Sequence, residues 1–239
     1  MPDAANSPTD PPGLRERKKQ RTRELIAERA RELFVARGFE QVTVAEIARA
    51  SEVSEKTVYN YFPSKEDLVF WRFESFEQEL LDAIREREPG DSVLAGFGRF
   101  VLQRRGLLAE QDATTRALLT GVTRMIAESP SLLAREQQIF ERYTRSLADL
   151  IAGELGADSG DLEPWVAANA LMGVHRALVA YARRRLLAVE RDLDVAADVL
   201  ARGTRALAAL EHGLGGYAVK QAASRGGDDT PERPVASPA

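Results

Sequence analysis

The sequence predicts an all-α protein in which a small N-terminal domain of three helices is linked by a long helix to a larger helical domain. Apolar residues recur every three or four positions along most of the chain, and no strand-like alternation or internal repeat interrupts them. Between Thr43 and Leu68, three helix starts and two tight turns follow one another closely, a pattern typical of a helix-turn-helix. The 239 residues, 44% of them apolar, suffice to fill a sizeable core.

Composition divides the chain into four regions. Residues 1–13 and 215–239 are rich in Pro, Gly and charges without periodic hydrophobics, so we expect disordered tails there. Residues 14–64 are expected to form the helix-turn-helix domain. Residues 65–214 are expected to form the larger helical domain.

The first helix is predicted from about Arg15 to Arg37, with Gly38 ending it. One side of this helix is apolar and is expected to face the core, and it carries Leu25, Ile26, Ala30, Leu33 and Phe34. The next helix start is a capping box, in which Thr43 and Glu46 each satisfy the backbone amide of the other.

The third helix is predicted to begin after a cap at Ser54. Val58 and Phe62 lie four residues apart and share one face, which we expect to pack against the other helices. The opposite side is polar and is left to bind; it carries Lys56, Tyr59 and Asn60, flanked by Thr57 and Tyr61.

Pro63 ends this helix, and Ser64 caps the next one, which is predicted to run from about Lys65 to Arg87. A cation such as Lys65 is unfavourable in a first helical turn because the helix dipole is positive there. A phosphate partner would explain its position.

The polar side of the third helix has the chemistry of a DNA-reading surface. Lysine binds phosphate or guanine, asparagine pairs with adenine through two hydrogen bonds, and threonine offers a hydroxyl and a methyl group to thymine. Tyrosine hydroxyls reach phosphate oxygens. An ordinary polar helix of a bundle is the alternative, and it leaves the combination of residues at this spacing unexplained.

The run from about Arg21 to Leu68 resembles the DNA-binding domain of the TetR family of bacterial repressors, above all in the segment LFVARGFEQVTVAEIARASEVSEKTVYNYFPSKEDL. Carried over position by position, this resemblance implies DNA contacts at Thr43, Ser54, Lys56, Thr57, Tyr59, Asn60, Tyr61 and Lys65. Many members have Lys-Gly, Arg-Gly or Pro-x where this chain has Glu55-Lys56. Glu55 therefore either reads a cytosine amine or stays out of the contact.

Composition excludes several kinds of site. The chain has no cysteine, which excludes disulfides and thiol nucleophiles, and its two histidines, His175 and His212, lack the spacing of metal ligands. We find no G-x-S-x-G, H-E-x-x-H, P-loop or dinucleotide fingerprint, so we expect neither an enzyme nor a cofactor. No signal peptide and no run of eighteen apolar residues is present, so a soluble cytoplasmic protein without membrane contact is expected.

The net charge of −4 does not by itself favour binding to nucleic acid. The distribution of charge does, because Arg15, Arg17, Lys18, Lys19, Arg21 and Arg23 crowd the start of the first helix. A solubilising basic tail is the alternative interpretation, and the sequence does not decide whether this basic segment contacts DNA.

The larger domain is predicted to contain helices near residues 91–109, 112–128, 131–155, 162–188 and 193–213, separated by Pro, Gly and Asp breaks. The last two combine small and apolar residues, and by the resemblance they correspond to the dimer interface of the family. A homodimer through residues 162–213 is therefore expected, which also suits an operator with two half-sites.

The larger domain is also expected to bind a small hydrophobic effector. Its aromatic residues, methionines and one histidine are candidates to line a cavity, although such residues are more often plain core. The candidates are Trp71, Phe97, Phe100, Met125, Phe140, Tyr143, Trp165, Met172 and His175.

The sequence therefore predicts a dimeric, ligand-responsive transcriptional regulator, most simply a repressor that a hydrophobic effector releases from a palindromic double-stranded DNA operator. A DNA-binding protein without a ligand switch is the main alternative. A helical scaffold for protein partners is a third, and it leaves the polar face and the basic segment unexplained.

Overall fold

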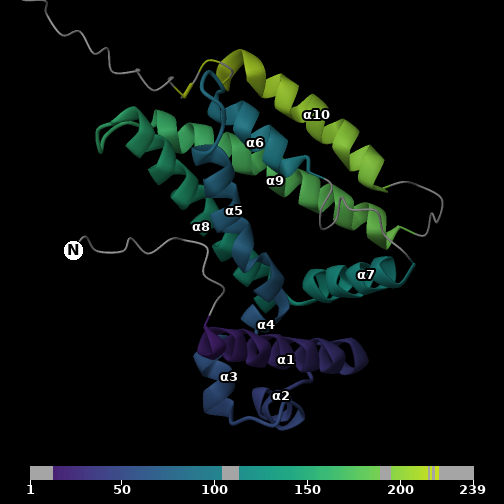
Figure 1. Cartoon of the computed structure of the whole chain (residues 1–239). Helices are drawn as coiled ribbons and strands as arrows, with labels where there is room; N and C mark the ends of the chain where they lie inside the picture. The colour runs from purple at the N-terminus through teal and green to yellow at the C-terminus, as the bar shows by residue number, and fades with distance from the viewer. Residues whose placement is uncertain (1–12, 104–112, 189–194, 215, 217–218, 221–239) are drawn as a thin grey trace, which may run out of the picture.

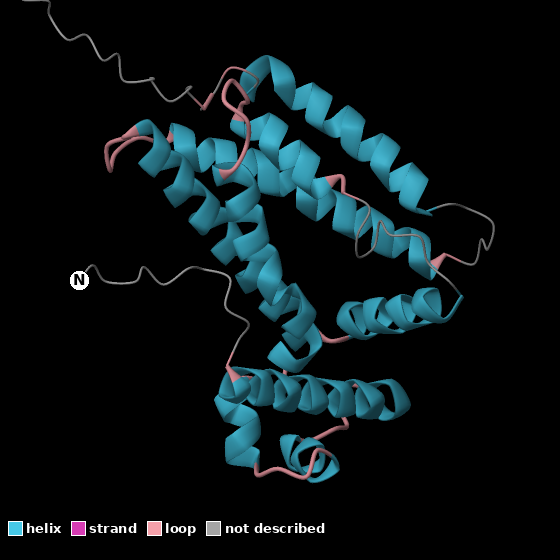
Figure 2. Cartoon of the chain, in the orientation of Figure 1, coloured by secondary structure: helices cyan, strands magenta, loops and turns pink. Residues whose placement is uncertain are grey.

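The computed structural model of the chain describes residues 13–103, 113–188, 195–214, 216 and 219–220. Within these ranges the regular secondary structure is helical and no strand occurs, which confirms the all-α prediction (Figure 2). The expected tails at 1–13 and 215–239 lie almost wholly outside the described residues. The same holds for the end of the helix predicted at 91–109.

Three helices form the N-terminal unit, with α1 lying between the other two and the rest of the molecule (Figure 1). They are α1 (Leu14–Arg37), α2 (Val44–Ala50) and α3 (Glu55–Tyr61). Ile26, Phe34, Ile47 and Phe62 are buried in the core that these helices share. Leu25 is 43% exposed, contrary to the sequence prediction, because Ile26, Ala27, Ala30 and Phe34 form the buried stripe and Leu25 lies at its edge.

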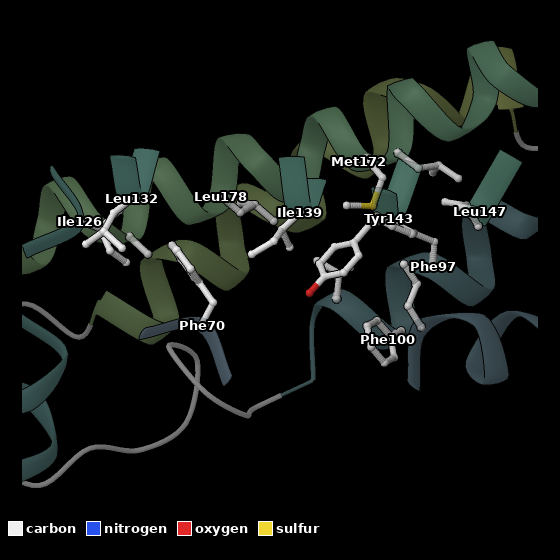
Figure 3. Packing of buried hydrophobic residues seen from close by; sticks show 14 of the residues in the cluster. Phe70, Phe97, Phe100, Ile126, Leu132, Ile139, Tyr143, Leu147, Met172 and Leu178 are labelled. Atoms are coloured by element: carbon white, nitrogen blue, oxygen red, sulfur yellow. The ribbon is translucent and has the colours of Figure 1, made fainter. Parts of the chain in front are cut away.

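The body contains five further helices of the described chain, of which α8 and α9 are the longest. They are α6 (Val93–Val101), α7 (Ala113–Glu128), α8 (Pro130–Leu155), α9 (Glu163–Leu187) and α10 (Val195–Leu214). The helix α9 packs against α7, α8 and α10, so it forms the centre of the body. Phe97, Leu132, Leu147 and Leu171 are fully buried between these helices, and each such side chain stabilises the fold by about 1.5–3 kcal/mol (Figure 3).

The connection between the two parts differs from the single helix predicted from Lys65 to Arg87. It consists of α4 (Asp67–Phe70), a 3-10 turn η1 (Trp71–Phe73) and α5 (Glu74–Arg85). The hydroxyl of Tyr143 on α8 donates to the carbonyl oxygen of Phe73 at 2.7 Å. That carbonyl therefore has a side-chain partner from the body, and the tighter 3-10 turn interrupts the α-helix at this point.

The far end of α5 is fixed to the body by a buried arginine. The side chain of Arg87 is 1% exposed and forms two hydrogen bonds with the carboxylate of Glu154 on α8, at 2.6 and 3.0 Å. Lys220, which belongs to the region expected to be a tail, donates through its Nζ to the carbonyl oxygens of Arg85 and Arg87. This residue of the expected tail is therefore bound to the body.

Candidate DNA-binding surface

The capping box predicted at the start of α2 is present. The amide of Glu46 donates to Thr43 Oγ1 at 3.3 Å, and the amide of Thr43 donates to Glu46 Oε2 at 2.8 Å. Arg37 at the end of α1 donates to Glu46 Oε1 at 2.7 Å. Together the Thr43 amide and the Arg37 guanidinium lower the pKa of the Glu46 carboxyl to about 2. The charged Glu46 therefore fixes where α2 starts and how it meets α1.

The turn between α2 and α3 requires a left-handed residue. Glu52 adopts this conformation with a φ of 56°, which costs about 1–2 kcal/mol for a residue with a side chain. The amide of Val53 donates to the carbonyl of Ala48 at 3.0 Å and closes the turn. The turn has no glycine, so this strained residue could not be predicted from the sequence.

The helix α3 begins at the predicted cap. The amide of Thr57 donates to Ser54 Oγ at 3.1 Å, and the two hydroxyl oxygens lie 2.8 Å apart. Val58 and Phe62 are buried, as predicted, and they hold the inner face of α3 against α1 and α2. The outer face is therefore fixed in direction by the packing of the inner face.

The predicted DNA contacts fall into two groups. Thr43, Ser54, Lys56, Tyr59 and Asn60 are exposed. Thr57 and Tyr61 are half-buried, and Tyr61 packs against the core. Figure 1 shows α2 and α3 on the side of α1 that faces away from the body, so the exposed group lies at one end of the molecule, where a DNA duplex can approach it.

Lys65 has a local partner that the sequence did not reveal. It is half-buried, and its Nζ lies 4.1 Å from the centroid of the Phe39 ring, which is a cation–π contact. This contact accounts for a cation at the start of the connecting segment without a phosphate. A phosphate contact by Lys65 stays a prediction.

The basic residues near the N-terminus belong to the first turns of α1. Arg15, Arg17, Lys18 and Lys19 are exposed there. The guanidinium of Arg23 lies 5.1 Å from the ring of Phe62, which joins this end of α1 to the end of α3. Positive charge at the start of α1 therefore lies near the end of α3, where it would attract phosphates of a duplex that α3 contacts.

Comparison with known proteins fits this geometry. Residues 26–70 match the profile described as "Bacterial regulatory proteins, tetR family", and residues 103–212 match the profile of the MftR C-terminal domain. The transcriptional regulator TcmR of Streptomyces glaucescens is 34% identical over 163 residues, which cover 67% of this chain and 71% of TcmR. The chain belongs to the TetR family.

Another relative and a solved structure cover more of the chain at lower identity. MftR of Mycobacterium tuberculosis, named as a mycofactocin biosynthesis transcriptional regulator, is 28% identical over 197 residues, 78% of this chain and 93% of MftR. The structure of NalD, a repressor of Pseudomonas aeruginosa, covers 80% of this chain and 97% of NalD, with 20% identity and a TM-score of 0.49. As a member of the TetR family, the chain is a transcriptional regulator and not an enzyme.

The described ranges contain neither a candidate metal site nor a candidate membrane-spanning helix. Within them no group of three or more His, Cys, Asp or Glu side chains is arranged to hold a metal ion. No helix of the described chain is long and apolar enough to cross a membrane.

The predicted effector residues occupy different places in the body. Phe97, Phe100, Tyr143 and Met172 are buried in one stretch of the core (Figure 3). Trp71, Met125 and Phe140 are half-buried and pack against the hydrophobic core, whereas Trp165 is 44% exposed. The structure therefore places these residues in or against the core and leaves Trp165 outside it.

His175 completes an aromatic cluster in the body. Its ring stacks on Phe76 with centroids 4.7 Å apart and meets Phe140 edge-on at 5.8 Å. The ring of Phe76 also stacks on Tyr143 and meets Phe100 edge-on, both at 5.3 Å. These rings come from α5, α6, α8 and α9 and pack directly against one another.

We expect Asn60→Ala to weaken binding to the preferred DNA site by about 5- to 150-fold, because a paired amide on a base contributes about 1–3 kcal/mol of discrimination. The Asn60→Ala variant also loses its sequence preference at one base pair of each half-site. Gln137→Ala removes an exposed amide from α8 and serves as the matched control. Fluorescence anisotropy with the selected site measures both, and equal affinity of Asn60→Ala and wild type would remove Asn60 from the recognition surface.

The second prediction concerns the pH dependence of stability. Burial, with a smaller contribution from the nearby Arg183 cation, lowers the pKa of His175 to about 4. Arg183 itself is paired with Glu136. Between this pKa and about 6.5 the unfolded chain binds a proton that the folded chain does not, so His175 destabilises the fold as the pH falls through this window.

We therefore expect the free energy of unfolding to fall by about 1–2 kcal/mol between pH 7 and pH 5 because of His175 alone. In His175→Phe, which keeps an aromatic ring in the stack, this part of the pH dependence disappears. Urea unfolding at both pH values measures the difference. An identical loss in wild type and variant would show that His175 is protonated in the folded protein.

Proposed function

We propose that this regulator is a homodimeric repressor that occupies a palindromic double-stranded operator until a small hydrophobic effector releases it. The observation that carries the proposal is the exposed group Lys56, Tyr59 and Asn60 on α3, a helix that lies on the side of α1 facing away from the body (Figure 1), together with the exposed basic start of α1. Such a protein acts where the chromosome is, in the bacterial cytoplasm.

The spacing of the two copies of α3 supplies the mechanism. Recognition helices of a dimer enter successive major grooves when their centres lie about 34–36 Å apart or a multiple of that distance. An effector that binds more tightly to a different arrangement of the two bodies shifts the population away from this spacing. The factor by which it lowers operator affinity is at most the ratio of its affinities for the two arrangements.

The dimer face is proposed on the exposed side of α9, within residues 162–213. Several small and apolar residues of this region face the interior of the protomer and cannot meet a partner; these are Ala167, Ala168, Leu171, Leu178 and Val199. Gly173 and Ala177 are exposed, and so are Val166 at 61% and Leu162 at 69%. Apolar side chains at such exposure, next to small residues, favour close packing against a second copy.

Gly173→Glu tests this face with little disturbance of the protomer, since no atom lies within 4 Å of the position that a Cβ would take at Gly173. We expect the variant to be folded but monomeric at micromolar concentration, because an unpaired charge buried in an interface costs several kcal/mol. Operator affinity then falls together with dimerisation. Gly153→Glu, at an exposed and equally open position on α8, is the control.

Sedimentation equilibrium decides between the outcomes. A wild-type monomer at this concentration would contradict the dimer. A dimeric Gly173→Glu variant would move the interface to another face of the body.

A constitutive DNA-binding protein is the second candidate function. It is supported by the rings around Phe76, because candidate cavity residues such as Phe100, Tyr143 and His175 pack directly against Phe76. Selection of bound sites from random DNA tests the DNA-binding function common to both candidates, with a palindromic site expected. A small molecule that binds the body and lowers affinity for that site supports the switch, whereas saturable binding without any change of affinity favours the constitutive protein.

A further inference from the structure

A groove lies at the joint between the N-terminal unit and the body. It has a volume of about 300 Å³ and is bounded on one side by the segment leading from α3 to η1 and on the other by α8. Its lining residues are Pro63, Asp67, Phe70, Phe73, Arg135, Ile139, Arg142 and Tyr143. Only Tyr143 belongs to the set that the sequence nominated for effector binding.

The floor of the groove is apolar and its rim is cationic. Phe70, Ile139 and Tyr143 are each less than a tenth exposed, and Phe73 at the rim is 42% exposed. Arg135 and Arg142 stand on the same side of α8, about 10 Å apart along the helix axis, with Ile139 between them. Each of these arginines is paired with a carboxylate, Arg135 with Asp67 and Arg142 with Glu77, both at 2.7 Å, so an anion that enters the groove has to exchange with one of these partners.

The carboxylate of Asp67 joins the two walls of the groove. One oxygen, Oδ1, accepts from Arg135 Nε at 2.8 Å and from an Nη of Arg135 at 2.7 Å. The other oxygen, Oδ2, accepts from the amide and the hydroxyl of Ser64. The start of α4 is therefore tied to α8 by an ion pair in which the carboxylate of Asp67 has donors on both oxygens.

The groove lies at the 3-10 turn where the connecting segment departs from a regular α-helix. Phe73 ends this turn, and its carbonyl is held by the Tyr143 hydroxyl. A molecule between Phe73 and α8 therefore touches both the turn and the ion pair. Short 3-10 stretches between α-helices often act as hinges, so a change here alters how α1, α2 and α3 sit on the body.

We propose that this groove is the effector site and that it takes a small amphipathic carboxylate, with its apolar part on Phe70, Ile139 and Tyr143 and its charge on Arg142 and Arg135. This inference rests on the proposed effector response and gives it a place and a ligand class. The ligand carboxylate competes with Asp67 for Arg135 and with Glu77 for Arg142, because each guanidinium already holds a carboxylate. Loss of the Asp67–Arg135 pair frees the start of α4 from α8 and lowers operator affinity.

Octanoate is a suitable probe, and octanol is its uncharged counterpart of similar length. We expect isothermal titration calorimetry on the full chain to show one octanoate site per protomer, with octanol bound at least tenfold more weakly. Saturating octanoate lowers operator affinity about 5- to 150-fold, the usual range of coupling between two sites. By reciprocity, operator DNA lowers octanoate affinity by the same factor.

Two variants locate the site without disturbing the core. Arg142→Gln removes a rim cation that is 47% exposed, and Phe73→Glu places a negative charge on the rim at an exposed position. We expect both to lose octanoate affinity by at least tenfold in the same calorimetric titration. Arg145→Gln, an exposed arginine of α8 outside the groove, binds octanoate like wild type.

The outcomes separate this inference from the proposed function. No octanoate binding to wild type at millimolar concentration overturns the ligand class, and unchanged affinity in both rim variants overturns the site. Octanoate that binds in the groove without weakening operator binding overturns the competition with Asp67. In each case a selected palindromic operator still supports the repressor, whereas failure to select any DNA site refutes the proposed function itself.

Discussion

The carboxylate of Asp67 is the point at which the two parts of this molecule meet. It receives the amide and hydroxyl of Ser64 at the start of α4 and the guanidinium of Arg135 from α8, and it is 7% exposed. A second contact, from the Ser129 hydroxyl to Glu40 at 2.6 Å, ties the first residue before α8 to the segment between α1 and α2. The start of α8 therefore contacts the N-terminal unit and its connecting segment at two places. The direction of the DNA-binding helices relative to the body depends on these polar contacts.

The N-terminal unit and the body are each rigidly packed, whereas the joint between them can adjust. Inside the N-terminal unit, the capping box of Thr43 and Glu46 and the buried side chains of Val58 and Phe62 fix α3 relative to α1 and α2. Inside the body, the aromatic rings around Phe76 pack in direct contact. The joint has instead an ion pair, a 3-10 turn and an open groove. Polar contacts at an exposed joint can be exchanged for contacts with a ligand, whereas packed rings cannot without loss of dispersion and burial.

The sequence predicted the features that depend on neighbours along the chain. The capping residues Thr43 and Ser54 and the buried pair Val58 and Phe62 could be predicted because caps and helix faces repeat at fixed spacings. The exposed group on α3 followed from the same periodicity.

Features that depend on partners distant in the chain could not be predicted. Lys65 lies over Phe39, Arg135 pairs with Asp67, and the hydroxyl of Tyr143 interrupts the helix expected from Lys65 to Arg87. The burial of Ala167 and Leu171 inside the protomer likewise depends on how α9 packs against its neighbours. Spacing in sequence identifies a face of a helix, but only the fold determines what that face meets.

The central claim is that the Asp67–Arg135 pair couples the DNA-binding helices to the body, and a double-mutant cycle measures this coupling most directly. The free energies of unfolding of wild type, Asp67→Asn, Arg135→Gln and the double variant are compared in urea. The account predicts a coupling of about 1–3 kcal/mol, against at most about 0.5 kcal/mol for the exposed pair Asp82 and Arg85 treated in the same way. Additive effects of Asp67→Asn and Arg135→Gln, with a coupling no larger than that of the exposed pair, would contradict it.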